Sequence, residues 1–221
     1  MVPEIYAPKL DVTESFSWGD IETAFEAARP VALQQAWQDR PDAGFRPASV
    51  RAGWNDDVLL VYAVLEDDHV FNPVTRFNQP AFTEGDVFEI FLRPHGQDAY
   101  FEFHINPNNQ KFQLRIPSIE AFQANRSRKG NIPRAWFLEE RAIHSRVKVE
   151  PEQRQWRILA DVRFDGVVER PSGHPEGAWL FSFSRYDYTP EARSPVLSST
   201  SPHQKVNFHR QQEWGRLHFV S

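Results

Sequence analysis

The chain has 221 residues, of which 40% are hydrophobic, 25% charged and 14% aromatic, enough for one large domain or two small ones. Its formal net charge of −5 makes a nucleic-acid partner a poor candidate, because binding a phosphate backbone needs clustered Lys and Arg. The absence of cysteine excludes disulfides, thiolate metal sites and cysteine nucleophiles. No apolar run approaches the roughly 18 residues of a membrane span.

The N-terminal residues 1–5 have neither a basic head nor an apolar stretch, so we expect no signal peptide in this chain. As the sequence stands, we expect a cytoplasmic protein. If a leader has been removed, a secreted or periplasmic location is expected instead.

The predicted elements are mostly strands. A short helix is expected over residues 20–28, with Asp20 as its cap, and residues 117–145 look like a long polar loop whose basic run 125–130 is solvated. Residues 58–65 form a continuous apolar run, typical of a strand buried on both faces, and Trp156 and Trp179 are expected in the core. Alternating patterns predict further strands at 87–92, 100–106, 112–116, 156–164, 179–186 and 216–220. We therefore predict an all-β fold, with residues 1–221 forming a single two-sheet antiparallel β-sandwich.

The register of the three central strands predicts a shared polar face. If their apolar sets all face the core, Phe88 pairs with Ile105, and Ile105 pairs in turn with Phe112. The alternate positions then lie together on the opposite face of the sheet, and these are Glu89, Glu102, His104, Asn106, Gln113 and Arg115.

Two interpretations of this face remain open. It is either the solvated side of an antiparallel sheet, with Glu102 and Arg115 as an ion pair, or a surface that binds a hydroxyl-rich ligand. Sugars pair their hydroxyls with carboxylate, imidazole and amide groups, and they pack a ring face on an aromatic side chain. Phe82, Tyr186 and Tyr188 are the candidates for that aromatic wall.

Several segments, in order along the chain, resemble the family 9 carbohydrate-binding modules, which have a DOMON-like β-sandwich. Residues 86–92 (DVFEIFL) are similar to the family's "gDxxEifl" strand, and residues 100–106 (YFEFHIN) to the strand that follows it. Further similar segments are 20–28, 59–67, 181–185, 207–209 and 214–219, so the resemblance covers nearly the whole chain.

The resemblance implies a sandwich that binds plant-type glycans or oligosaccharide ends, often beside calcium. It implies that Glu89, His104 and Asn106 hydrogen-bond sugar hydroxyls. The chain also keeps the arginine of a family motif, as Arg185. The family clamps a sugar between two Trp side chains, whereas this chain has Phe82 near the first position and no aromatic residue over 197–200.

Acidic residues at strand ends suggest a calcium site, because Ca²⁺ prefers oxygen ligands. The candidate ligands are Asp67, Asp68 and Asp86. No zinc-type histidine spacing, nucleophile elbow or phosphate loop is present, so catalysis by this chain is not expected.

We therefore predict a non-catalytic carbohydrate-binding protein with an oligosaccharide or polysaccharide ligand, acting in glycan breakdown or uptake. The candidate binding residues are Phe82, Glu89, His104, Asn106, Gln113, Arg185 and Tyr188. One alternative is a haem-binding DOMON-type redox domain, which would need His104 and His209 as axial ligands. Another is an interaction domain that has lost sugar binding.

Overall fold

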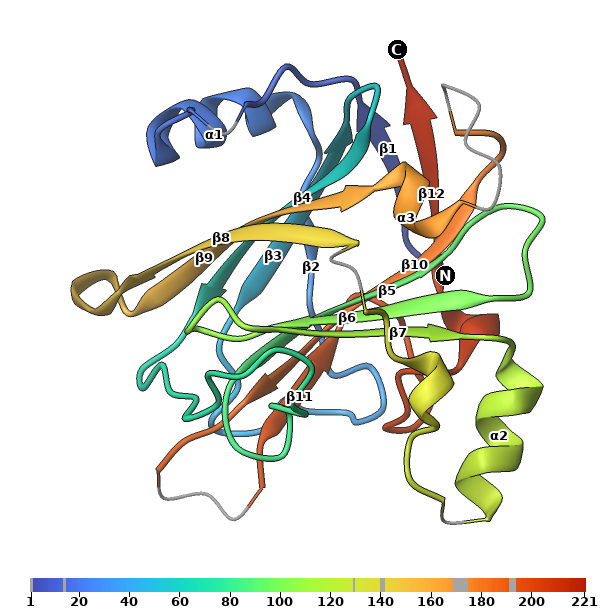
Figure 1. Cartoon of the computed structure of the whole chain (residues 1–221). Helices are drawn as coiled ribbons and strands as arrows, with labels where there is room; N and C mark the ends of the chain where they lie inside the picture. The colour runs from blue at the N-terminus through green and yellow to red at the C-terminus, as the bar shows by residue number, and fades with distance from the viewer. Residues whose placement is uncertain (1, 14, 129, 140–141, 169–174, 191–193) are drawn as a thin grey trace.

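The computed structural model describes residues 2–13, 15–128, 130–139, 142–168, 175–190 and 194–221, and shows the predicted two-sheet β-sandwich (Figure 1). One sheet has the order β1-β12-β10-β5-β6-β7, with β11 also paired to β10. The other has the order β2-β3-β4-β9-β8. All pairs of described strands are antiparallel except β1–β12 in the first sheet, which is parallel.

The strands of the first sheet are β1 (Glu4–Pro8), β5 (Val87–Arg93), β6 (Tyr100–Ile105), β7 (Lys111–Ile116), β10 (Trp179–Asp187), β11 (Val196–Ser199) and β12 (Gly215–Val220). Those of the second are β2 (Val31–Ala32), β3 (Ala48–Trp54), β4 (Val58–Glu66), β8 (Ile143–Glu150) and β9 (Gln155–Arg163). The helices are α1 (Trp18–Ala24), α2 (Ile119–Ser127) and α3 (Phe164–Val167), with 3-10 turns at Phe25–Ala27, Arg134–Trp136, Pro151–Gln153 and Gln211–Glu213. Strands β1, β2, β3, β8 and β11 were not predicted from the alternation pattern.

The main core fills the space between the sheets. Trp156 and Trp179 are fully buried there, as predicted, together with Phe88, Ile90 and Phe103 from the inner face of β5 and β6. Burying aromatic side chains of this size contributes about 2–3 kcal/mol each to stability.

The central strand β4 is covered on both faces, as its continuous apolar run predicts. Leu59 and Val61 face the core, whereas Leu60 and Tyr62 pack under helix α1. The N-cap of α1 is Ser17, and Asp20 closes a capping box by accepting from the Ser17 backbone N–H at 2.9 Å. The prediction of Asp20 as the N-cap was therefore wrong. The N-cap is Ser17, three residues earlier, whose hydroxyl accepts from the Asp20 N–H.

The register of the β6–β7 hairpin differs from the prediction by one residue. Ile105 pairs with Lys111 and Phe103 with Gln113, so Gln113 and Arg115 point to the inner face and Phe112 to the outer one. The prediction assumed that every apolar set faces the main core. On β7 the apolar side chains instead join a second hydrophobic cluster on the outer face, which includes Trp136 and Trp214.

Residues 117–145 are not one long polar loop. Ser118 caps helix α2 by accepting from the Ala121 N–H, and α2 lies beside β7 at the edge of the seven-stranded sheet (Figure 1). The basic run 125–130 lies at the end of this helix, except for Lys129, which is outside the described residues. Partly buried Phe122 packs against the outer cluster, which explains why a helix forms here. Within the described residues, no helix is long and apolar enough to cross a membrane.

Candidate binding cavity on the outer face of the sheet

A cavity of about 310 Å³ lies on the outer face of the seven-stranded sheet. Its walls come from β5, β6, β10, the loop before β5, helix α2 and the loop before β12. The lining residues are Phe82, Glu89, Phe91, Glu102, His104, Phe122, Arg126, Tyr186, Val206, Asn207, Phe208 and His209. This volume is at the low end of the range for small-molecule sites.

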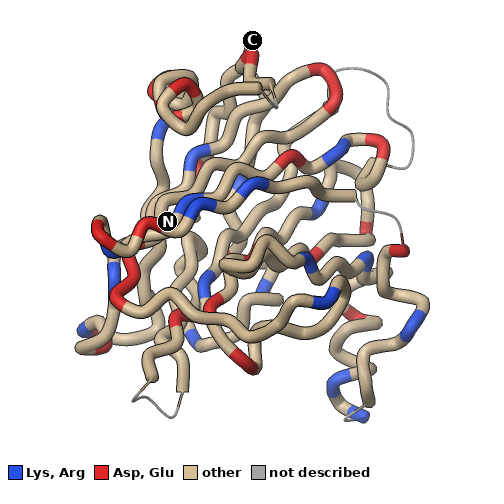
Figure 2. The backbone as a smooth tube through the Cα atoms, turned by 60° about the vertical axis from the view of Figure 1, so that its left-hand side comes forward, with Lys and Arg blue, Asp and Glu red and all other residues tan. Residues whose placement is uncertain are grey.

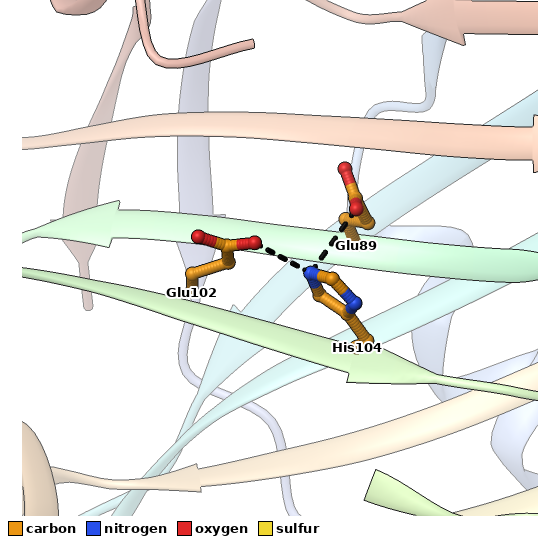
Figure 3. A group of neighbouring side chains, drawn as sticks. All are labelled: Glu89, Glu102 and His104. Atoms are coloured by element: carbon orange, nitrogen blue, oxygen red, sulfur yellow. Dashed lines mark hydrogen bonds and ion pairs between the residues drawn. The ribbon is translucent and has the colours of Figure 1, made fainter. Parts of the chain in front are cut away.

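Three buried polar side chains form the floor of the cavity. His104 Nε2 lies 2.7 Å from Glu102 Oε1 and 3.1 Å from Glu89 Oε1, so one imidazole nitrogen faces two carboxyl groups (Figure 3). The β5–β6 register predicted from the sequence is confirmed, and it places Glu89 directly opposite His104. The other oxygen of Glu89, Oε2, is buried without a hydrogen-bond partner among the described residues. This oxygen therefore has an unfilled capacity for one hydrogen bond.

The protonation of the three side chains follows from their burial and mutual contacts. Burial raises the pKa of Glu89 to about 8, so this carboxyl group is neutral near pH 7. Burial acts in the same direction on Glu102, but the hydrogen bond with His104 and the electrostatic contributions of His209 and His104 together outweigh it and lower the pKa of Glu102. The two carboxyl groups likewise outweigh the effect of burial on His104 and raise its pKa. These shifts favour a protonated Glu89 and an ion pair between Glu102 and His104.

Aromatic rings stand beside this floor. Phe82 packs edge-on against His104 with centroids 5.5 Å apart, and against Tyr186 with centroids 5.7 Å apart. Phe122, from α2, stacks on His209 at 3.7 Å. Burial lowers the pKa of His209 to about 4, so its imidazole is neutral. The cavity therefore combines aromatic faces with hydrogen-bonding groups.

The sequence identified only part of this lining. Phe82, Glu89 and His104 line the cavity as predicted, and Tyr186 is the second predicted aromatic that reaches it. Phe122 and Arg126 were missed because no helix was expected there. The signal was available in Ser118 followed by a helix-compatible run from Ile119.

Two predicted site residues lie elsewhere and already have partners. Asn106 donates to Val74 O at 2.8 Å and accepts from Gln110 N at 2.9 Å, so it holds two loops. Gln113 points inward and accepts from the backbone N–H of Ile143 at 3.2 Å, because the register shift turns it away from the outer face.

Arg185 and Tyr188 are also outside the cavity lining. Arg185 pairs with Phe88 across the sheet, so its side chain points to the inner face, where it donates to Asp67 Oδ2 at 2.8 Å. Tyr188 supports the cavity indirectly, since its hydroxyl donates to the backbone oxygen of Phe82 at 2.7 Å.

A second buried cluster joins Asp67, Asp86 and Asp187, whose carboxylate oxygens lie within 4.8 Å of one another. Arg185 Nη2 lies 2.8 Å from Asp67 and 3.0 Å from Asp187. Two of the three predicted calcium ligands are therefore together. Asp68 is not among them, because it pairs with Arg46 and Arg154 near the surface. Asp187 was missed because it is remote in sequence.

Burial dominates the electrostatics of this second cluster. It raises the pKa of Asp86 to about 8, and the neighbouring Asp67 adds to the effect. Burial also raises the pKa of Asp187 to about 6, although Arg185 opposes it. Each oxygen of Asp86 accepts from a backbone N–H, of Phe71 and of Tyr188.

Comparison with known structures identifies the fold class as that of the family 9 carbohydrate-binding modules. A proposed carbohydrate-binding protein from Bacteroides uniformis superposes with a TM-score of 0.75 at 16% identity, over 98% of this chain and 99% of that one. A family 9 module from Caldicellulosiruptor kristjanssonii in complex with cellotriose gives a TM-score of 0.65 at 16% identity, covering 99% and 95%. A second structure described as a family 9 module of that organism, in complex with glucose, gives 0.65 at 14% identity, covering 99% and 96%. Neither a family model nor a curated protein matches the chain by sequence.

Proposed function

We propose that this protein binds saccharides in the cavity on the outer face of the seven-stranded sheet. The observation that carries the proposal is the buried Glu89–His104–Glu102 floor beside aromatic rings. The ligands of the two Caldicellulosiruptor modules with the same fold, cellotriose and glucose, favour this ligand class.

Each part of the lining has a role in this proposal. The neutral carboxyl of Glu89 donates to and accepts from ring hydroxyls, and its partnerless Oε2 gains the hydrogen bond that it lacks. Glu102 accepts from a further hydroxyl while remaining paired with His104. Phe82 and Phe122 offer faces to the C–H side of the sugar ring, a contact that is favourable for aromatic side chains.

We further propose that binding is non-catalytic and serves glycan breakdown or uptake, for example beside a glycoside hydrolase. Glycosidases place the scissile bond between two carboxyl groups. Here the His104 imidazole occupies the space between Glu89 and Glu102, at 3.1 Å and 2.7 Å from them. A glycosidic oxygen has no room between the two groups.

We propose Asp67, Asp86 and Asp187 as the ligands of a calcium ion, in place of the set predicted from the sequence. When all three are ionised, three negative charges and the single positive charge of Arg185 leave a net charge of −2, which a divalent cation neutralises. Asp187 Oδ2 accepts no hydrogen bond of good geometry. A bound ion would fix the loop before β5, which carries Phe82.

Saccharide binding is tested with a glycan array, followed by calorimetric titration of a hit. We expect Glu89→Leu to weaken binding about tenfold, because a sugar hydroxyl loses its buried partner. The control is Glu84→Gln, an exposed change on the loop before β5, with unchanged affinity expected. Equal affinity in Glu89→Leu and wild type, or no saccharide bound at millimolar concentration, would contradict the proposal and favour an interaction domain.

The haem alternative needs His104 and His209 as axial ligands. Both imidazoles instead face the same carboxylate, since His209 Nε2 lies 3.8 Å from Glu102 Oε2 and His104 Nε2 lies 2.7 Å from Oε1. We expect an absorption spectrum of the purified protein with added haem to show no specific Soret shift. A shift that His104→Ala removes would restore this alternative.

A further inference from the structure

A second hollow, of about 470 Å³, adjoins the mouth of the binding cavity. The two hollows share Arg126, Val206 and Asn207 in their walls. The outer hollow adds Gln123, Ser127 and Lys205. A ligand longer than one ring in the cavity would therefore extend past Arg126 and towards Lys205.

The outer hollow is positively charged. Arg126 and Lys205 are both exposed, and neither makes an ion pair or side-chain hydrogen bond with another described residue. The end of α2 that bears Arg126 is marked by basic positions in Figure 2. Among the described residues that line this hollow there is no Asp or Glu to neutralise the two cations.

The floor of the inner cavity does not reverse this charge. Both Glu102 and Glu89 face His104 Nε2, at 2.7 Å and 3.1 Å, and burial raises the pKa of Glu89, so the negative charge of the floor is offset within the floor itself. An anionic group bound near Arg126 thus meets two unpaired cations and a floor whose carboxyl groups already face His104. Arg also binds carboxylate and sulfate groups in a bidentate geometry that neutral hydroxyls do not reproduce.

We propose that the saccharide recognised by this protein is acidic, with a sugar ring in the inner cavity and a carboxylate of the uronate type between Arg126 and Lys205. The inference rests on the proposed saccharide function and specifies its ligand class. It also gives the basic run of the sequence a role, since Arg126 lines the cavity.

The test compares matched pairs of neutral and acidic sugars by calorimetry at low ionic strength. The matched pairs are glucose with glucuronate and galactose with galacturonate, together with short oligomers of each. Sulfated forms of the neutral sugars are titrated as a second kind of anion. We expect the uronate member of the bound pair to bind about tenfold more tightly, and the preference to shrink in 0.5 M salt as charges are screened. Tighter binding of the sulfated than of the uronate sugar would overturn the uronate assignment.

Substitutions of the two basic residues test whether they cause the preference for uronate sugars. Arg126→Gln and Lys205→Gln should each reduce uronate affinity about three- to fivefold, and the double variant should remove the preference by lowering uronate affinity more than neutral-sugar affinity. Arg128→Gln, an exposed change on the same helix end that lines neither hollow, is the matched control.

The outcomes separate the two proposals. Binding of the neutral members with equal or better affinity overturns the acidic-ligand inference and leaves saccharide binding intact. A uronate preference that survives the double variant also overturns it. If no sugar of either kind binds, the proposed function itself fails.

Discussion

Two buried polar clusters in this molecule are built from similar residues but differ in how their oxygens are used. In the cavity cluster, Glu89 lines the cavity, is 2% exposed and keeps one oxygen without a hydrogen-bond partner among the described residues. In the acidic cluster, both oxygens of Asp86 accept from backbone N–H groups, and Arg185 holds the other two carboxylates. The first cluster is suited to a ligand that supplies hydroxyls, and the second is suited to holding strand ends together.

The largest expected effect is on stability, at the acidic cluster. Arg185→Met removes the buried cation that pairs with Asp67 and Asp187, so we expect the free energy of unfolding to fall by about 3–5 kcal/mol in urea denaturation. Arg46→Met, which breaks a pair with Asp68 near the surface, should cost less than about 1 kcal/mol. Similar losses in the two variants would show that the buried cluster has no special structural role.

The next effect is the response of the acidic cluster to pH and calcium. In the folded state Asp86 keeps its proton up to about pH 8 and Asp187 up to about pH 6. In the unfolded chain both side chains lose their protons near their ordinary pKa of 3.8. Because the folded state binds more protons in this window, stability should fall as pH rises from about 4 to 8 in chelator.

Calcium should oppose this loss by binding the ionised carboxylates. At 100 times its dissociation constant, it should stabilise the fold by about 2.7 kcal/mol, with a larger effect at pH 8 than at pH 5. Melting temperatures recorded with calcium and with chelator, at pH 5 and at pH 8, measure this stabilisation. A melting temperature that calcium leaves unchanged at both pH values would remove the metal from this site.

The smallest effect is on affinity, at the cavity. Phe122→Ala should weaken saccharide binding about fivefold by removing one aromatic face. Phe71→Ala is the control, since Phe71 is 53% exposed and does not line the cavity. Equal losses of affinity in the two variants would show that the aromatic lining of the cavity is not the ring contact.

The sequence was sufficient for the sandwich, for seven of its strands and for the β5–β6 register. Alternation determines a register when one face of a strand is apolar and the other polar, as it is around Glu89 and His104. The alternation rule failed at β7, where the apolar side chains face a second hydrophobic cluster that includes Trp136 and Trp214 from more distant parts of the chain.

Long-range placement limited the prediction of both clusters in the same way. Asp67 and Asp68 are adjacent in sequence, yet only Asp67 turns into the acidic cluster, and its partner Asp187 lies on β10. The cavity likewise takes Phe122 and Arg126 from α2, and although the local pattern at Ser118 allows a helix there, it does not say that the helix packs beside the cavity. Such choices depend on packing between remote segments, which no local pattern contains.

The most direct test of the account follows the imidazole ¹⁵N resonances during titration with the bound saccharide. His104 and His209 line the cavity, whereas His69, His144 and His218 do not. We predict that the resonances of His104 and His209 shift with the saccharide concentration and saturate with the calorimetric affinity, while those of the other three stay in place. Saturated saccharide binding that leaves His104 and His209 unmoved would contradict the claim that this cavity is the binding site.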